Sequence, residues 1–201
     1  MKPYVAGIAS GVGGGKTTLV ERLAHHLGDA SAIHFDHYER VTERPIEAIR
    51  QWLRDGADPD AFEIARLGED LRLLKEDCAV DDPATGARIL ARKYLLFEAP
   101  FGRRHSATGR YIDFLVWIDT PFDLALARKI RQLTADAEAR HAAGFHQWLR
   151  TYLDNYVDVV AGLLRRQHDT VRADADLVVD GTLDPEALAG EVARIIRTRF
   201  S

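Results

Sequence analysis

Short continuous apolar runs alternate along the chain with longer segments of helical periodicity. The apolar runs predict strands at 4–9, 31–35, 93–98, 114–118 and 177–179. Helices are predicted between these runs, notably across 45–74, after 120, across 145–166 and from 185. Strands that are apolar throughout are buried on both faces, so the pattern predicts an α/β fold with a mainly parallel sheet and helices on each side.

Several helix boundaries carry local signals. Gly28 follows an apolar stripe and stands where a left-handed C-cap belongs. Asp58-Pro59 and Asp184-Pro185 each place a capping carboxylate before a first-turn proline, which predicts a helix start at each pair.

Two further segments yield expectations about packing. The predicted helix across 145–166 carries Trp148, Tyr152 and Tyr156 at regular spacing, which favours core packing over ligand contact. Residues 79–88 are rich in turn-forming types and predict a loop or a hairpin.

Composition narrows the class of protein. A chain of 201 residues favours a single domain spanning 1–201, and the formal charge of −4 argues against broad nucleic-acid binding. Cys78 is the one cysteine and no apolar run approaches the roughly 20 residues of a membrane helix, so we expect a cytoplasmic protein without a membrane anchor. A homodimer stays open.

A glycine-rich loop between the first strand and the next helix is the strongest chemical signal. Glycines let backbone N–H groups surround a phosphate, and the positive end of the helix faces the anion. In this Walker A-like segment, Lys16 is expected to reach the β- and γ-phosphates of a nucleotide and the Thr17 hydroxyl to bind Mg²⁺. The predicted nucleotide-binding residues are Gly11, Gly13, Gly14, Gly15, Lys16, Thr17 and Thr18.

The loop departs from the strict pattern at Ser10, where glycine is usual. Either the loop is slightly remodelled or Ser10 tolerates the turn. A dinucleotide-binding fingerprint fits less well, because it would need glycine where Lys16 stands.

Two carboxylates end predicted strands and would share the rim where ligands bind a parallel sheet. Asp36 could accept the proton of an acceptor hydroxyl, or it could simply cap a turn. Glu98 could hold Mg²⁺ through a water or act as a second base, or it could pair with a nearby arginine.

Arginines supply candidate positive charge. Arg128 and Arg131 share a helix face and could close over a nucleotide as a lid at about 126–145, or they could form a solvated basic face. Arg103 and Arg104 follow Glu98 and could grip an anionic acceptor, or they could be exposed loop charge.

These residues together resemble the uridine kinase and phosphoribulokinase group of P-loop kinases. Gly15-Lys16-Thr17-Thr18, Phe35-Asp36-His37-Tyr38 and Asp58-Pro59-Asp60-Ala61-Phe62 are similar to three of its motifs. The strand end at Glu98, Asp119-Thr120-Pro121 with its following arginines, and Asp176-Leu177-Val178-Val179 are similar to three more.

The resemblance implies a P-loop NTPase fold with a five-stranded parallel sheet flanked by helices. It implies ATP and Mg²⁺ as cofactors and a catalytic set of Asp36, Lys16, Arg128 and Arg131, with Thr17 and Glu98 at the metal. Tyr38 would lie beside the acceptor.

Uridine kinases carry a Tyr-Asp and a His in the hairpin expected at about 78–92, and this chain has neither the Tyr nor the His there. Nucleoside, sugar, sugar phosphate or another small alcohol therefore all stay open as acceptor, and Arg88, Arg103 and Arg104 would suit an anionic one. The prediction is an ATP-dependent phosphotransferase with an alcohol group as acceptor. A nucleotide-binding switch or a pseudo-kinase is the alternative, although guanine-specifying and Asp-Glu Walker B motifs are both missing.

Overall fold

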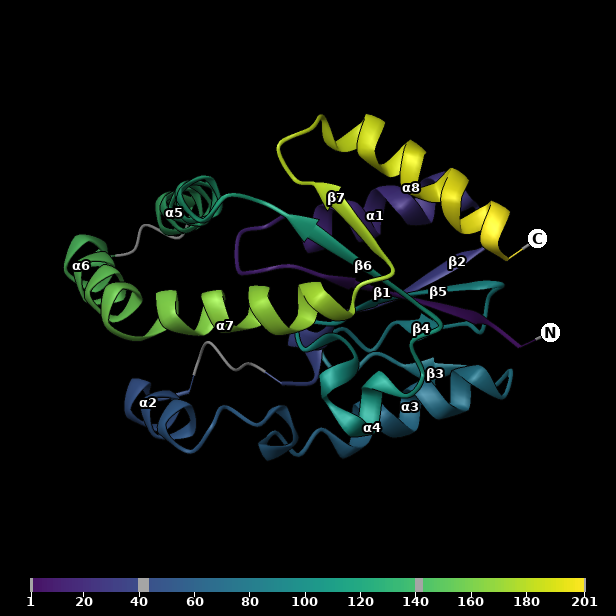
Figure 1. The fold of residues 1–201 in the computed structure, drawn as a ribbon, viewed down its shortest axis with the longest axis horizontal. Coiled ribbons are helices and arrows are strands. Elements are labelled where there is room, and N and C mark those ends of the chain that lie inside the picture. The colour runs from purple at the N-terminus through teal and green to yellow at the C-terminus, as the bar shows by residue number, and fades with distance from the viewer. Residues whose placement is uncertain (1, 40–43, 140–142, 201) are drawn as a thin grey trace.

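The computed structural model describes residues 2–39, 44–139 and 143–200. Its centre is a parallel sheet of five strands in the order β2-β5-β1-β6-β7 (Figure 1). The strands are β1 (Tyr4–Ala9), β2 (Ala30–Ile33), β5 (Tyr94–Glu98), β6 (Phe114–Asp119) and β7 (Leu177–Asp180). The predicted α/β fold with a five-stranded parallel sheet is confirmed.

Helices cover both faces of this sheet, and each face has its own apolar cluster (Figure 1). One face packs against α1 (Lys16–Leu27) and α8 (Pro185–Arg199). The other is covered by α3 (Ala65–Lys75), α4 (Ser106–Gly109) and α7 (Ala161–Val171). β1 contributes alternate residues to the two clusters, which is why its whole run is apolar.

Several predicted boundaries are confirmed. The Asp184 carboxylate caps α8 by accepting from the backbone N–H groups of Glu186 and Ala187. Gly28 ends α1 with φ of 77°, a value that glycine adopts readily. The hairpin predicted at 79–88 is formed by β3 (Val80–Asp81) and β4 (Arg88–Ile89).

The prediction of a helix start at Asp58-Pro59 is wrong. Asp58 does accept a hydrogen bond from Asp60 N, but it caps only a short 3₁₀ turn, Pro59–Ala61. The helical region divides into α2 (Ile46–Arg54) and α3, because Gly56 at φ 101° and Ala57 at φ 52° end the first helix.

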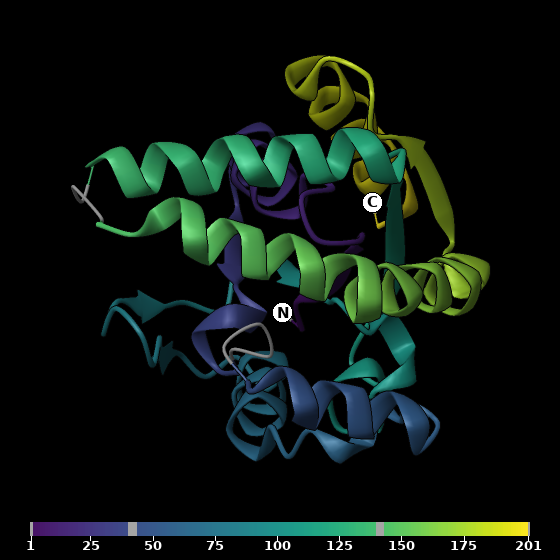
Figure 2. The same cartoon turned by 90° about the vertical axis from the view of Figure 1, so that its left-hand side faces the viewer.

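The predicted long helix exists, but it is divided. It consists of α6 (Phe145–Asn155), a π-helical turn (Tyr156–Val160) and α7, and it runs beside α5 (Phe122–Ala139) (Figure 2). Of the lid predicted at about 126–145, residues 140–142 lie outside the described residues.

The prediction that the aromatics of this helix are core residues holds for Tyr156 and is wrong for Trp148. Tyr156 is 9% exposed, whereas Trp148 is 49% exposed. Trp148 instead stacks on Phe145 and Tyr152, with ring centroids 5.8 and 5.5 Å apart. None of the residues of α6 is buried, so no other element of the described residues covers this face of the helix.

Among the helices of the described ranges, none has both the length and the apolar character needed to cross a bilayer.

Candidate active site

The glycine loop joins β1 to α1 in a conformation that depends on its glycines. Gly13 and Gly15 have φ values of 75° and 102°. A Cβ at Gly13 would lie 2.1 Å from the carbonyl oxygen of Ala125, and one at Gly14 would lie 2.5 Å from Ser10 Oγ. At Gly15 a Cβ would have no neighbour within 4 Å. The loop therefore packs tightly against α5 on one side and leaves open space at the N-terminus of α1, which fits a phosphate cradle.

Ser10 is accommodated without strain. Its side chain is buried, its hydroxyl donates to Gly11 O at 2.9 Å, and its φ is not positive. Of the two explanations for this departure, tolerance of the turn is therefore correct.

Lys16 is held within the loop. Its Nζ donates to the carbonyl oxygens of Ser10 at 3.1 Å and Gly11 at 3.3 Å. Burial lowers the pKa of Lys16, while the negative charges of Glu98 and Asp36 act against that decrease. A cation thus stands beside two carboxylates at the mouth of the loop.

A cleft of about 720 Å³ lies over the loop and collects most of the predicted site residues. Gly13, Gly14, Gly15, Lys16, Thr17, Thr18, Asp36, Glu98, Arg128 and Arg131 all line it. Gly11 does not line the cleft, but its carbonyl oxygen accepts from Gly14 N and from Lys16.

Asp36 lies on a 3₁₀ turn, Phe35–His37, that follows β2. Its carboxylate is exposed toward the cleft, and among the described residues no side chain forms a hydrogen bond with it. The surrounding protein partly desolvates the group, which raises the pKa of Asp36, and the nearby Lys16 charge limits this increase. Such a carboxylate is free to contact a ligand.

Glu98 is buried at the end of β5, with 4% of its surface exposed. Burial acts to raise its pKa, but contacts with His34, Thr17 and Lys16 outweigh this and hold the pKa of Glu98 below its usual value. His34 Nδ1 lies 3.2 Å from Glu98 Oε1, without the alignment of a hydrogen bond, so that buried oxygen has no donor.

His34 forms an ion pair with the Glu98 carboxylate, and Glu98 raises the pKa of His34. An ionised carboxylate beside the Thr17 hydroxyl also fits a divalent cation. No cluster of three or more His, Cys, Asp or Glu that could hold a metal exists within the described residues. Proteins commonly hold Mg²⁺ through one or two side chains while phosphates and water complete the shell, and Glu98 with Thr17 would supply such side chains.

α5 brings cations to the opposite wall of the cleft. Arg128 Nη1 donates to Gly181 O at 3.0 Å, and Arg131 lines the cleft one turn further along the helix. Four other residues that line the cleft were not predicted from the sequence. Lys129 and Gln132 lie beside the two arginines on α5, and Gly181 and Leu183 follow β7. The only sequence signal for these residues was their position beside the arginines or just after a strand.

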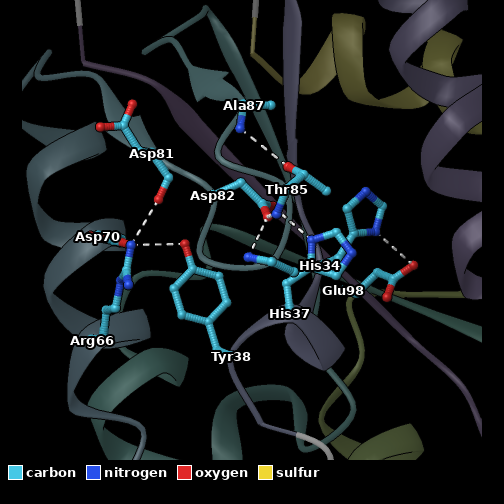
Figure 3. A network of polar contacts seen from close by, with 11 residues as sticks. His34, His37, Tyr38, Arg66, Asp70, Asp81, Asp82, Thr85, Ala87 and Glu98 are labelled. Atoms are coloured by element: carbon cyan, nitrogen blue, oxygen red, sulfur yellow. Dashed lines mark hydrogen bonds and ion pairs between the residues drawn. The ribbon is translucent and has the colours of Figure 1, made fainter.

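The predicted acceptor residues are not brought together. Tyr38 lies near Asp36, and its hydroxyl donates to Asp70 Oδ2 at 2.8 Å (Figure 3). Arg88 is exposed and pairs with Asp81 at 3.0 Å, and Arg104 is also exposed. Arg103 is bonded to the Asp176 carboxylate and to Asp174 O. Neither Tyr38 nor any of these three arginines lines the cleft.

No protein-family model matches the chain. A uridine kinase of Psychromonas ingrahamii is 27% identical over 163 residues, which cover 73% of this chain and 76% of that protein. A uridine kinase of Chloroflexus aggregans is 26% identical over 213 residues, covering 96% of this chain and 94% of the other. The resemblance to uridine kinase-like P-loop kinases is confirmed.

The fold is shared as well. The structure of a possible uridine kinase from Bacillus stearothermophilus superposes with a TM-score of 0.54 at 15% identity, over 90% of each chain. Together with the glycine loop and its cleft, these similarities support an ATP-dependent small-molecule kinase.

Proposed function

We propose that this chain transfers the γ-phosphate of ATP to a hydroxyl of a small molecule, with Asp36 as the base. The hydroxyl oxygen attacks the γ-phosphorus, the bond between that phosphorus and the oxygen of ADP breaks, and the hydroxyl proton passes to Asp36. One domain spanning 1–201 would carry the reaction, with the segment at about 126–145 as lid.

The observation that carries this proposal is that Asp36, Lys16 and Glu98 line one cleft with the glycine loop. A kinase needs a base for the acceptor, a cation for the transferring phosphoryl group and a metal ligand, and these residues supply one of each. A nucleotide switch would not need an exposed carboxylate such as Asp36 facing the same space.

Mg·ATP, when bound, supplies the phosphoryl group and a metal charge that neutralises it. The loop from Gly11 to Thr18 would hold the phosphates, while Thr17 and Glu98 would hold Mg²⁺. Lys16, Arg128 and Arg131 would stabilise the negative charge that builds up on the phosphoryl oxygens.

The acceptor would lie on the Asp36 side of the cleft, and Tyr38, which is bonded to Asp70, would need to turn toward the cleft to contact it. The names of the relatives favour a nucleoside. The hairpin, however, lacks the tyrosine and histidine that uridine kinases carry there, so a sugar, a sugar phosphate or another small alcohol is included in the proposal. Arg88, Arg103 and Arg104 would need to leave their present surroundings to contact an anionic acceptor, since none of them lines the cleft.

The test is ADP release from Mg·ATP in the presence of nucleosides, sugars, sugar phosphates or pantothenate. We expect one acceptor class to stimulate the rate. Asp36→Asn should reduce the stimulated rate about 10²- to 10⁴-fold while leaving ATP affinity unchanged. Asp29→Asn, which alters an aspartate outside the cleft, serves as the matched control.

ATP binding without stimulation by any acceptor would overturn the kinase proposal and favour a nucleotide switch. Equal stimulated rates in Asp36→Asn and the control would be consistent with a kinase but would show that Asp36 is not its base.

A further inference from the structure

The turn that presents Asp36 is held on both sides of that residue. Phe35, before it, is buried in the apolar cluster and packs edge-on against Phe101 at 5.6 Å. His37 and Tyr38, after it, each reach a different aspartate outside the turn (Figure 3). The direction of the Asp36 carboxylate therefore depends on its neighbours' contacts.

Asp82 is the partner of His37 and comes from the β3–β4 hairpin. His37 Nδ1 lies 2.6 Å from Asp82 Oδ2, and Asp82 is 6% exposed (Figure 3). The other carboxylate oxygen, Oδ1, accepts from the backbone N–H groups of Ala84 and Thr85, each at 2.9 Å. Asp82 thus uses one oxygen to form the hairpin turn and the other to hold the turn that carries Asp36.

Asp81, its neighbour in sequence, has no such role. The Asp81 side chain is 59% exposed and pairs with Arg88 across the hairpin. Asp81 therefore makes a contact within the hairpin, whereas Asp82 joins the hairpin to the turn that carries Asp36.

The connection continues toward the glycine loop. The His37 ring lies 5.1 Å from the His34 ring, and His34 Nδ1 lies 3.2 Å from Glu98 Oε1. Glu98 in turn contacts Thr17. A continuous series of contacts therefore joins Asp82 of the hairpin to Glu98 at the expected metal site through His37 and His34. Asp36 is adjacent to His37 in the sequence.

We propose that Asp82 is a positioning residue, which acts through His37 to fix the turn that presents the Asp36 base. The folded geometry of the hairpin then sets the direction of the catalytic carboxylate. This inference rests on the proposed function only in naming Asp36 as the base.

Two pairs of substitutions separate this role from simple hairpin stability. Asp82→Asn keeps a carbonyl oxygen for Ala84 N and Thr85 N but removes the acceptor for His37, and Asp81→Asn is its control. His37→Asn keeps an N–H donor near the position of Nδ1, whereas His37→Gln moves the amide about one bond further out. We therefore expect His37→Asn to keep the hydrogen bond to Asp82 and His37→Gln to lose it.

The first readout is backbone hydrogen exchange without any acceptor. Asp82→Asn and His37→Gln should speed exchange in residues 35–38 at least fivefold, while Asp81→Asn and His37→Asn should leave it unchanged. A role confined to the hairpin would change exchange only in residues 82–87. Unchanged exchange in 35–38 for both Asp82→Asn and His37→Gln overturns the proposal, whatever the activities are.

The second readout is Mg·ATP turnover with whichever nucleoside, sugar, sugar phosphate or pantothenate stimulates the wild-type protein. With that acceptor, Asp82→Asn should lower kcat about 10- to 100-fold with the KM for ATP unchanged, as expected when a reacting group is misplaced. An unchanged kcat would overturn the positioning role. If the wild-type protein phosphorylates none of the acceptor classes, the proposed function fails, and the exchange experiment still decides whether Asp82 holds the turn.

Discussion

The hydroxyl of Thr120 donates a hydrogen bond of 3.0 Å to the carbonyl oxygen of Gly14, which joins the end of β6 to the glycine loop. Gly181, at the end of β7, lies against the same hydroxyl, since a Cβ there would be 1.9 Å from Thr120 Oγ1. The loop is therefore held from the sheet rim as well as by its own backbone bonds. The three residues form a support for the loop on the side away from Asp36.

Thr120→Val should weaken nucleotide binding. Valine keeps the shape of threonine but leaves Gly14 O without its donor, a loss of about 1 kcal/mol or roughly fivefold in affinity. Calorimetric titration with Mg·ATP measures this effect. Thr170→Val, which removes a hydroxyl bonded to its own helix outside the cleft, is the control and should bind normally. Equal affinities for both variants would contradict a supporting role for Thr120.

The titration of Asp36 should respond to its two charged neighbours in opposite directions. Burial raises the pKa of Asp36, the Lys16 charge lowers it and the Glu98 charge raises it. Lys16→Met should therefore move the carboxyl midpoint upward, and Glu98→Gln should move it downward. Carbon-13 NMR of the Asp36 carboxyl follows both, with Lys2→Met as a control for an exposed lysine.

The sign of the activity profile follows from the same pKa. A general base acts when deprotonated, so activity should fall as the pH drops through the raised pKa of Asp36. The lowered pKa of Glu98 keeps that group ionised to a lower pH, so Asp36 should define the acid limb. If the pKa of Asp36 moved in the same direction in Lys16→Met and Glu98→Gln, direct charge interactions with these two residues would not control that pKa.

Gly13→Ala should destabilise the protein and abolish ATP binding. An alanine there would need φ of 75° and would place its Cβ 2.1 Å from the backbone oxygen of Ala125, which no side-chain movement relieves. We expect a loss of about 2 kcal/mol or more in the free energy of unfolding. Gly162→Ala is the opposite case, because its Cβ would have open space on α7, and it should gain about 0.5–1 kcal/mol. Urea denaturation of both variants checks the contrast, and equal stabilities would show that α5 yields easily.

The sequence allowed the strands and the rim carboxylates to be predicted for a physical reason. Strands buried on both faces are apolar throughout, and the carboxyl ends of parallel strands meet at one rim, which brings Asp36 and Glu98 near the loop. The pairs that hold the site could not be predicted in this way. His37 and Asp82 are 45 residues apart, and no periodicity records which turn a hairpin will touch.

The positive charge of an arginine likewise did not indicate which group it would bind. Arg103 was predicted to suit an anionic acceptor, but it is bonded to Asp176, 73 residues away in the chain. The spacing of aromatics on a helix indicates a shared face but does not indicate whether another element covers that face. That is why Tyr156 is buried and Trp148 is not.

Trp148→Ala should therefore cost far less stability than its size suggests. Trp148 is 49% exposed and, among the aromatic pairs of the described residues, it contacts only the rings of Phe145 and Tyr152. Its removal should therefore lower the free energy of unfolding by about 1 kcal/mol or less. Trp117→Ala is the matched comparison, because that tryptophan is 2% exposed in β6 and its loss should cost about 3–5 kcal/mol. Urea denaturation of both variants gives the difference directly. A large loss for Trp148→Ala would mean that α6 packs against a further surface in solution, so the concentration dependence of unfolding should be measured alongside.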